Sequence, residues 1–524
     1  MRVATAKKLI PNWENAILAI LAAVLLILAF PDFEYWFLAW FALVPLMWAV
    51  EREKESTLRS FVVGWLFGTA FFFGTCWWLT FAPITYAGFP WPLAYFLMLC
   101  VSVAVGVFPA LFAGILAVLL RRFGSWAFLA APFDWVFMEF LRYWVTGNNW
   151  NAIGYSQAFA EPLRNLAAIG GVLVVGFVVV SISSLIIAAI RRPSVSATTA
   201  SSCLIGIAAI FASLMSNPDS PCQTGNCESA DIVALQPNVP MSGLTSSDLE
   251  RLRQRQIDAA ERELAKPRIA NRRQPTTVIL PESPMNFMYN DDREFQAFIH
   301  EFASRNNVNV LFNSAEPDAT NGKYFNSAVM VSPQGTEAAQ YDKIYLLPFG
   351  EAVPGPLEGI LPGFVGNFSY GREYDLLPLG DAKAGVMICF ESHFGQLSRR
   401  YVQDGADVLI EMTNDGYLGP TPVLRQHLAN AVFRAVETNR PVLRVTNVGI
   451  TAYINERGQV LDPAAPYQED TRVWSVSKSD GSQTFYVKYG DWFAWLCTVV
   501  TVGLLIFGIA TRRRESPRAT NIKA

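Results

Sequence analysis

Glu282, Lys343 and Cys389 are side chains of three types that together support nucleophilic catalysis, and each follows a short apolar run of the chain. The three runs are residues 277–280, 338–341 and 386–388. Such runs are typical of buried strands, so we expect the three side chains to meet at one edge of a sheet. The thiol would be the nucleophile, the carboxylate its general base and the ammonium group a partner for the oxyanion. Taken singly, each charge is also consistent with a solvated surface residue, and Cys389 with a buried structural cysteine.

The residues after Cys389 predict a change from strand to helix. Ser392 is of the type that caps a helix N-terminus. Phe394, Leu397 and Tyr401 have the spacing of one apolar helix face. A cysteine at the start of such a helix faces backbone N–H groups, which favour the thiolate over the thiol.

The composition indicates that much of the chain crosses a membrane. Apolar residues make up 52% of the 524 residues and charged residues only 16%. Seven apolar runs lie near 14–30, 34–50, 61–81, 91–120, 125–141, 165–190 and 201–216, and an eighth lies near 491–511. The sequence therefore predicts about eight transmembrane helices. The first run is not typical of a cleavable signal peptide, because another span follows almost at once.

Loops that carry basic residues alternate along the chain with loops that carry few or none. The basic groups are Lys7 and Lys8, Arg52, Lys54 and Arg59, Arg121 and Arg122, Arg191 and Arg192, and Arg512, Arg513 and Arg514. Positive-inside bias therefore predicts that both termini are cytoplasmic and that residues near 217–490 lie outside. In a bacterium this is the periplasmic face of the inner membrane.

The fifth run holds three ionisable residues, Asp134, Glu139 and Arg142. Such residues are costly in a membrane span and are functional by default, although Glu139 and Arg142 have the spacing of a simple pair. The polar and aromatic loop 147–157 follows them. It fits either a lipid entrance or an interfacial anchor.

From residue 231 the pattern changes to short apolar runs that alternate with amphipathic stretches. Strands are expected at 232–235, 278–280, 308–312, 327–331, 385–388, 408–412, 442–446 and 451–454. Helices are expected near 247–266, 292–304, 393–403 and 422–438. This alternation predicts an α/β domain at 229–488, between a seven-span domain at 1–228 and a C-terminal helix with a basic tail at 489–524.

Four short motifs resemble the carbon–nitrogen hydrolase (nitrilase) superfamily, whose triad is Glu, Lys and Cys. They are Leu-Pro-Glu282, Asp-Lys343, Pro-Phe-Gly-Glu351 and Ile-Cys389-Phe-Glu391. Membrane spans on both sides narrow the resemblance, which covers nearly the whole chain, to the apolipoprotein N-acyltransferase family. It implies that the catalytic domain is an α-β-β-α sandwich and that Glu282, Lys343 and Cys389 are catalytic. Glu351 and Glu391 would orient Lys343 or the incoming amine, with a plain salt bridge as the alternative for each.

The resemblance also implies the reaction. A phospholipid would donate its acyl chain to Cys389 as a thioester, and the N-terminal amine of a diacylglyceryl-cysteine apolipoprotein would then accept it. Two residues depart from the family pattern: Phe390 stands where tyrosine is common, and Tyr417 where tryptophan is usual. Because of these departures, the resemblance does not define the details of the acceptor pocket.

Other readings and partners follow from the remaining residues. A tethered amidase shares the same triad, an inactive lipoprotein-binding scaffold is a second alternative, and a Cys–His pair with His393 or His427 is a third. The net charge of −3 gives no argument for nucleic-acid binding. No Cys/His group has zinc spacing, so we expect no metal site, and we expect no cofactor. We also expect the chain to be a monomer. Cys222 and Cys227 have the spacing of a small disulfide loop in an oxidising compartment. The apolar, Gly- and Pro-rich stretch 355–371 is expected to be either a mobile lid or a packed loop.

Overall fold

The computed structural model describes residues 10–161, 163–191, 228–270, 275–282, 284–348, 350–353 and 368–512. The chain divides into two compact units. The first joins Met1–Asn217 to Asp491–Ala524, and the second is Pro218–Gly490. Cys222, Cys227, the predicted seventh span and most of the stretch 355–371 lie outside the described residues, so the predictions made for them stay predictions.

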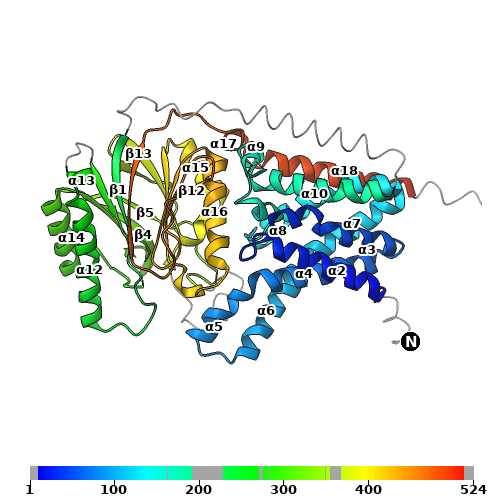
Figure 1. The fold of residues 1–524 in the computed structure, drawn as a ribbon, viewed down its shortest axis with the longest axis horizontal. Helices are drawn as coiled ribbons and strands as arrows, with labels where there is room; N and C mark the ends of the chain where they lie inside the picture. The colour runs from blue at the N-terminus through cyan, green and yellow to red at the C-terminus, as the bar shows by residue number, and fades with distance from the viewer. Residues whose placement is uncertain are drawn as a thin grey trace, which may run out of the picture. The chain divides into compact units, whose positions relative to one another are not determined.

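The first unit is helical. Its α-helices are α2 (Trp13–Ala29), α3 (Ala39–Glu53), α4 (Thr57–Cys76), α5 (Phe81–Thr85), α6 (Trp91–Val105), α7 (Val107–Phe123), α8 (Ala131–Thr146), α9 (Ala167–Gly170), α10 (Val172–Arg191) and α18 (Trp492–Arg512). The C-terminal helix α18 packs against α8, where the rings of Phe140 and Trp495 lie 5.1 Å apart (Figure 1). Helix α18 therefore completes a unit that the N-terminal part of the chain begins.

Small residues allow close packing of α4 on α7. A Cβ added at Gly64 would lie 2.6 Å from the Cβ of Ala113, and one added at Gly68 would lie 2.9 Å from the Cα of Gly106. Gly64 and Gly68 are four residues apart on one face of α4, a spacing that brings helix backbones together in membranes. A larger side chain at either position would push the two helices apart.

Within the described ranges, four helical stretches are long and apolar enough to cross a membrane. They are Thr57–Thr85, Trp91–Thr146, Val172–Arg191 and Trp492–Ala510. Trp13–Ala29 is a shorter apolar helix. Helices that could cross a membrane are thus present, whereas the total of eight spans stays a prediction.

The ionisable residues of the fifth apolar run are buried and are tied to the loop that follows them. Arg142 donates to the carbonyl oxygen of Trp150 at 2.8 Å and to Oδ1 of Asn149 at 2.9 Å. Glu139 accepts a hydrogen bond from the backbone N–H of Ile153 at 2.7 Å. These contacts hold the loop 147–157 to α8; a role at a lipid entrance stays a prediction.

The second unit is an α/β structure with two sheets. The seven-stranded sheet has the order β13-β1-β2-β3-β4-β5, with β6 paired to β4, and the six-stranded sheet has the order β12-β11-β10-β9-β8-β7. The strands of the first sheet are β1 (Glu228–Gln236), β2 (Thr276–Ile279), β3 (Asn309–Asp318), β4 (Lys323–Val331), β5 (Glu337–Asp342), β6 (Phe368–Ser369) and β13 (Asp470–Ser477). Those of the second are β7 (Leu376–Leu379), β8 (Ala382–Ile388), β9 (Val408–Thr413), β10 (Val442–Thr446), β11 (Ala452–Ile454) and β12 (Val460–Leu461). The predicted strands are confirmed.

Helices cover each sheet. The helices α12 (Ser246–Leu264) and α14 (Arg293–Asn306) pack on the first sheet, and α15 (Gly395–Gln403) and α16 (Val423–Thr438) pack on the second (Figure 1). Strands of the two sheets contact each other, β1 with β10 and β4 with β8. The four predicted helices are confirmed, and apolar side chains fill the space between each helix pair and its sheet.

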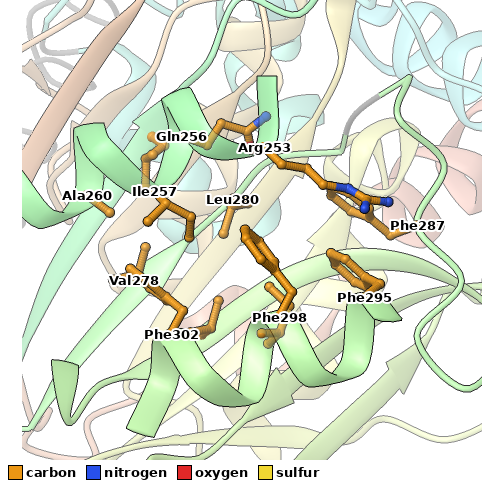
Figure 2. A pocket seen from close by; sticks show the side chains of 13 residues that line it. Arg253, Gln256, Ile257, Ala260, Val278, Leu280, Phe287, Phe295, Phe298 and Phe302 are labelled. Atoms are coloured by element: carbon orange, nitrogen blue, oxygen red, sulfur yellow. The ribbon is translucent and has the colours of Figure 1, made fainter. Parts of the chain in front are cut away.

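Figure 2 shows a small pocket inside this packing, between α12 and α14. Phe295, Phe298 and Phe302 line it from α14, and the guanidinium group of Arg253 lies over the ring of Phe295, 5.5 Å from its centroid. None of the predicted catalytic residues lines this pocket. It belongs to the core that supports the first sheet.

Candidate active site

The two sheets bring the predicted catalytic residues together. Glu282 follows β2 and Lys343 follows β5, both in the first sheet, whereas Cys389 follows β8 in the second. The Cys389 thiol, the Glu282 carboxylate and the Lys343 ammonium group lie close enough to interact electrostatically with one another. The expectation of a single sheet edge is therefore wrong: the site forms where two sheets face each other, so neither sheet holds it alone.

The backbone at Cys389 is unusual. Its φ of +53° lies in the left-handed region, which non-glycine residues adopt rarely and which is common at functional sites. A five-residue 3-10 turn, Cys389–His393, starts there, and α15 begins only at Gly395. The expectation that Ser392 caps this helix is wrong, because its hydroxyl lies within the turn and donates to the carbonyl oxygen of Cys389 at 3.4 Å.

The thiol is neutral in this setting. Burial raises the pKa of Cys389 well above its ordinary value, Glu282 raises it further, and Lys343 opposes this only in part. The expectation that the helix end favours the thiolate is wrong, because desolvation and the neighbouring carboxylate have the larger effect. A base must therefore remove the proton during the reaction.

Glu282 is the predicted base. Its Oε2 accepts from the backbone N–H of Asn414 at 3.1 Å, and its Oε1 accepts from Nδ2 of Asn326 at 3.3 Å. Burial raises the pKa of Glu282, and the positive charge of Lys343 partly offsets this increase. A carboxyl group whose pKa is shifted toward neutral is a better proton acceptor and donor at working pH.

Lys343 is fully buried and stays charged. Its Nζ lies 2.7 Å from Oε1 of Glu351. Burial alone would lower the pKa of Lys343, but the carboxylates of Glu351 and Glu282 outweigh it and the pKa is raised. A fixed ammonium group in a dry site stabilises an oxyanion more strongly than the same group does in water.

Asn326 connects the two glutamates, a role that the sequence did not reveal. Its Nδ2 donates to Glu351 at 2.7 Å as well as to Glu282. Its backbone carbonyl oxygen accepts from the backbone N–H of Lys343 at 2.9 Å. Asn326 stands next to the predicted strand 327–331 as an uncharged amide. Only its polarity beside an apolar run marks it out in the sequence.

Glu391 links the segment of Lys343 to that of Cys389. Its Oε1 accepts from the backbone N–H groups of Ile344 at 2.7 Å and Tyr345 at 3.0 Å and from the Tyr341 hydroxyl at 2.8 Å. Its Oε2 accepts from the backbone N–H of Ile388 at 2.9 Å. Burial raises the pKa of Glu391 to about 7, although these donors and Lys343 favour its charged form. Glu351 pairs with Lys343, whereas Glu391 holds the backbone on either side of the site.

The two histidines near the cysteine contact its neighbours. The ring of His393 is stacked with that of Phe390, with centroids 5.8 Å apart. His427 points at the backbone: its Nε2 lies 3.1 Å from the carbonyl oxygen of Cys389. This geometry does not favour a Cys–His pair. Tyr417, which like Phe390 departs from the family pattern, is 48% exposed.

Comparisons with known proteins agree with the two-unit arrangement. Residues 22–185 match the family described as apolipoprotein N-acyltransferase N-terminal domain, and residues 230–484 match the carbon–nitrogen hydrolase family. An apolipoprotein N-acyltransferase of Geobacter metallireducens is 30% identical, with 96% of each chain covered. One of Pasteurella multocida is 27% identical, with 95% of this chain and 96% of the relative covered.

Among solved structures, the chain is similar to Nit3 of Saccharomyces cerevisiae, a member of branch 10 of the nitrilase superfamily. The two are 15% identical with a TM-score of 0.36, over 56% of this chain and 96% of Nit3. The curated relatives, by contrast, match along almost the whole of both chains. This chain is therefore an acyltransferase that belongs to the apolipoprotein N-acyltransferase family.

Proposed function

We propose that the chain transfers an acyl group from a phospholipid to the N-terminal amine of a diacylglyceryl-cysteine apolipoprotein, through a thioester on Cys389. The observation that carries this proposal is the buried cluster of Cys389, Glu282 and the charged Lys343, whose side chains interact electrostatically. The membrane-length helices of the same chain suit two lipidic substrates. We also infer that the two sheets and their helices form the four-layer sandwich of the superfamily.

In the first half-reaction Glu282 takes the proton of the Cys389 thiol as Sγ attacks the ester carbonyl of the phospholipid. Lys343 stabilises the resulting oxyanion. The ester C–O bond then breaks, and the leaving alcohol of the lysophospholipid takes the proton from Glu282. The product is an acyl thioester with Glu282 again ionised.

In the second half-reaction the amine of the lipoprotein attacks the thioester carbonyl. Glu282 takes a proton from the amine, an amide C–N bond forms, and the C–S bond breaks. The sulfur leaves as a thiolate and takes the proton back from Glu282. Glu351 and Asn326 hold Lys343 and Glu282 in place through both steps.

The alternative that shares the triad is a tethered amidase, which passes its acyl group to water. The two activities differ in how the acyl-enzyme is discharged. A transferase must keep water from the thioester, because hydrolysis competes with the amine. An inactive scaffold would form no acyl-enzyme at all.

We expect acyl-enzyme prepared with phospholipid to persist in buffer and to be cleared when a diacylglyceryl-cysteine peptide is added. Intact-protein mass spectrometry follows the loss of the acyl mass, and peptide analysis identifies the new amide. The matched control is the same lipopeptide with an acetylated N-terminus, which should leave the acyl-enzyme intact. Clearance by buffer alone at the rate seen with the free amine would favour the amidase.

The proposed location is the bacterial inner membrane, with the catalytic unit on the periplasmic side and both termini in the cytoplasm. Ser247 is exposed in α12 of the catalytic unit, and Ser516 belongs to the C-terminal basic tail. In intact spheroplasts, a membrane-impermeant maleimide should label Ser247→Cys and not Ser516→Cys, with the unmodified chain as background. The reverse labelling would overturn this topology.

A further inference from the structure

A cluster of four ionisable side chains lies beneath the turn that carries Cys389. They are Glu411 at β9, Asp415 in the turn after it, His427 in α16 and Arg444 in β10, and each is at most 4% exposed. Arg444 forms ion pairs with Glu411 and, at 2.7 Å, with Asp415. His427 lies 2.7 Å from Asp415 through Nδ1 and 3.1 Å from Glu411 through Nε2. None of these groups takes part in the proposed chemistry.

The charges of the cluster balance only when His427 is protonated. Burial alone would lower the pKa of His427, but Asp415 and Glu411 outweigh it and raise the pKa to about 9. Burial alone would raise the pKa of Glu411, yet Arg444 and His427 lower it to about 2. Two cations therefore face two anions, and both ring nitrogens of His427 carry a proton that they donate.

One of those protons is directed at the nucleophile's own backbone. Nε2 of His427 lies 3.1 Å from the carbonyl oxygen of Cys389 and 3.0 Å from the hydroxyl oxygen of Ser392. The Ser392 hydroxyl in turn donates to the same carbonyl at 3.4 Å. The carbonyl of Cys389 is thus held by the imidazole directly and by a hydroxyl that the imidazole orients.

The same helix holds the far end of the turn. Arg434, two turns along α16, donates to the carbonyl oxygens of Ser392 at 3.2 Å and His393 at 2.9 Å. His427 and Arg434, both in α16, therefore contact carbonyl oxygens of the turn Cys389–His393. The thiol of Cys389 itself interacts with Glu282 and Lys343.

We infer that His427 is a positioning residue, which fixes the left-handed backbone of Cys389 through its carbonyl and so aims Sγ at the reacting carbon. The inference rests on the proposed role of Cys389 as nucleophile. A buried ion cluster is not needed for stability alone, because apolar side chains of similar volume often replace one without loss. What an apolar residue cannot supply is a donor to the Cys389 carbonyl.

Two replacements of His427 separate this donor from the rest of the cluster. In His427→Gln the side-chain amide nitrogen takes the place of Nε2 and retains a donor to the Cys389 carbonyl. In His427→Asn the amide nitrogen takes the place of Nδ1, so it reaches Asp415 and leaves the carbonyl without this donor. Both variants remove the imidazolium charge, so each controls for the other.

The full-length enzyme is tested in detergent by two readouts. The first is the rate constant of acyl-enzyme formation over a range of phospholipid concentrations. The second is the rate at which iodoacetamide alkylates Cys389. We expect His427→Asn to lower both by about 100-fold, the effect of misplacing a reacting group by about 1 Å, and His427→Gln by no more than about tenfold. The phospholipid KM should stay unchanged in both, and thermal unfolding gives the folded fraction for correction.

Equal losses in the two variants, no loss in either, or a loss in His427→Asn that the folded fraction accounts for would each overturn the inference. The alkylation readout keeps it separate from the proposed function. A wild-type enzyme that forms no acyl-enzyme contradicts the proposed function, while the expected order of alkylation rates would still support the positioning role. A wild-type enzyme that acylates, with both variants alike, leaves the proposed function standing and rejects the role of His427.

Discussion

Cys389→Ala is expected to lose acyl transfer by about 10⁴-fold or more, the scale found when other enzymes lose their nucleophile. The reason is that the proposed reaction runs through a covalent bond to Sγ in both half-reactions. Neither Glu282 nor Lys343 offers a replacement, since one is the base and the other is a buried ammonium group paired with Glu351. The fold should be retained, because the turn at Cys389 is held by its backbone carbonyl rather than by its thiol.

The measurement is intact-protein mass spectrometry after incubation with phospholipid and without acceptor. The wild-type chain should gain the mass of one acyl chain and lose it in neutral hydroxylamine, which cleaves thioesters. Cys100, which is exposed, supplies the matched control: Cys100→Ala should acylate as the wild type does. An acyl mass that survives in Cys389→Ala would show that another group is the nucleophile.

Glu282→Gln is expected to slow acyl-enzyme formation by about 10²- to 10⁴-fold, the range for loss of a general base. Glutamine has nearly the same shape but does not take the thiol proton, and burial keeps the pKa of Cys389 too high for the thiol to ionise unaided. Phospholipid binding should change little. Single-turnover acylation, measured by the growth of the acyl mass, separates the chemical step from binding.

The pH dependence gives this prediction a second readout. Burial raises the pKa of Glu282 above the ordinary value of 4.5, and the base works only when deprotonated. The rate should therefore rise with pH through a midpoint above 4.5, since the ionised fraction grows as pH passes the raised pKa.

Variants show which carboxyl group causes this rising limb of the pH–rate profile. The limb should be absent in Glu282→Gln and should persist, at a lower overall rate, in Glu282→Asp. Glu391, whose pKa is raised to about 7, is the other carboxyl group that titrates in this range. A limb that persists in Glu282→Gln and disappears in Glu391→Gln would contradict the assignment of Glu282 as the base.

The sequence predicted the strands of this site better than their assembly. The apolar runs before Glu282 and Cys389 are strands whose side chains are buried in a core, whereas in the strand before Lys343 only Tyr341 is buried. Nothing in those runs specifies which of two sheets each strand joins, so the expectation of one sheet edge failed. The close approach of α15 to β8 does leave a sequence signal: a Cβ at Gly385 would lie 2.4 Å from Cγ of Tyr401.

The hydrogen-bond partners of Glu282 and Cys389 could not be predicted because they come from distant segments of the chain. The backbone of Asn414 reaches Glu282 across 132 residues, and His427 reaches the Cys389 carbonyl across 38. The expectation that Ser392 caps a helix fails for a local reason. Glu391 accepts a hydrogen bond from the N–H of Ile388, which closes a tight turn before the helix begins. Capping patterns in sequence do not distinguish a helix start from such a turn.

The pairing of β1 with β13 has a consequence for biosynthesis. These are the first and last strands among the described residues of the catalytic unit, and the hydrogen bond from Ser475 to Asp231 spans 244 residues. Contacts between such distant segments make folding slow, and β1 keeps an unpaired edge until its partner has been synthesised. A ribosome must therefore translate almost the whole catalytic unit before the sheet that holds Glu282 and Lys343 is complete. Chains that stop before residue 470 expose this edge of β1 to other nascent chains, and they are candidates for aggregation or early degradation.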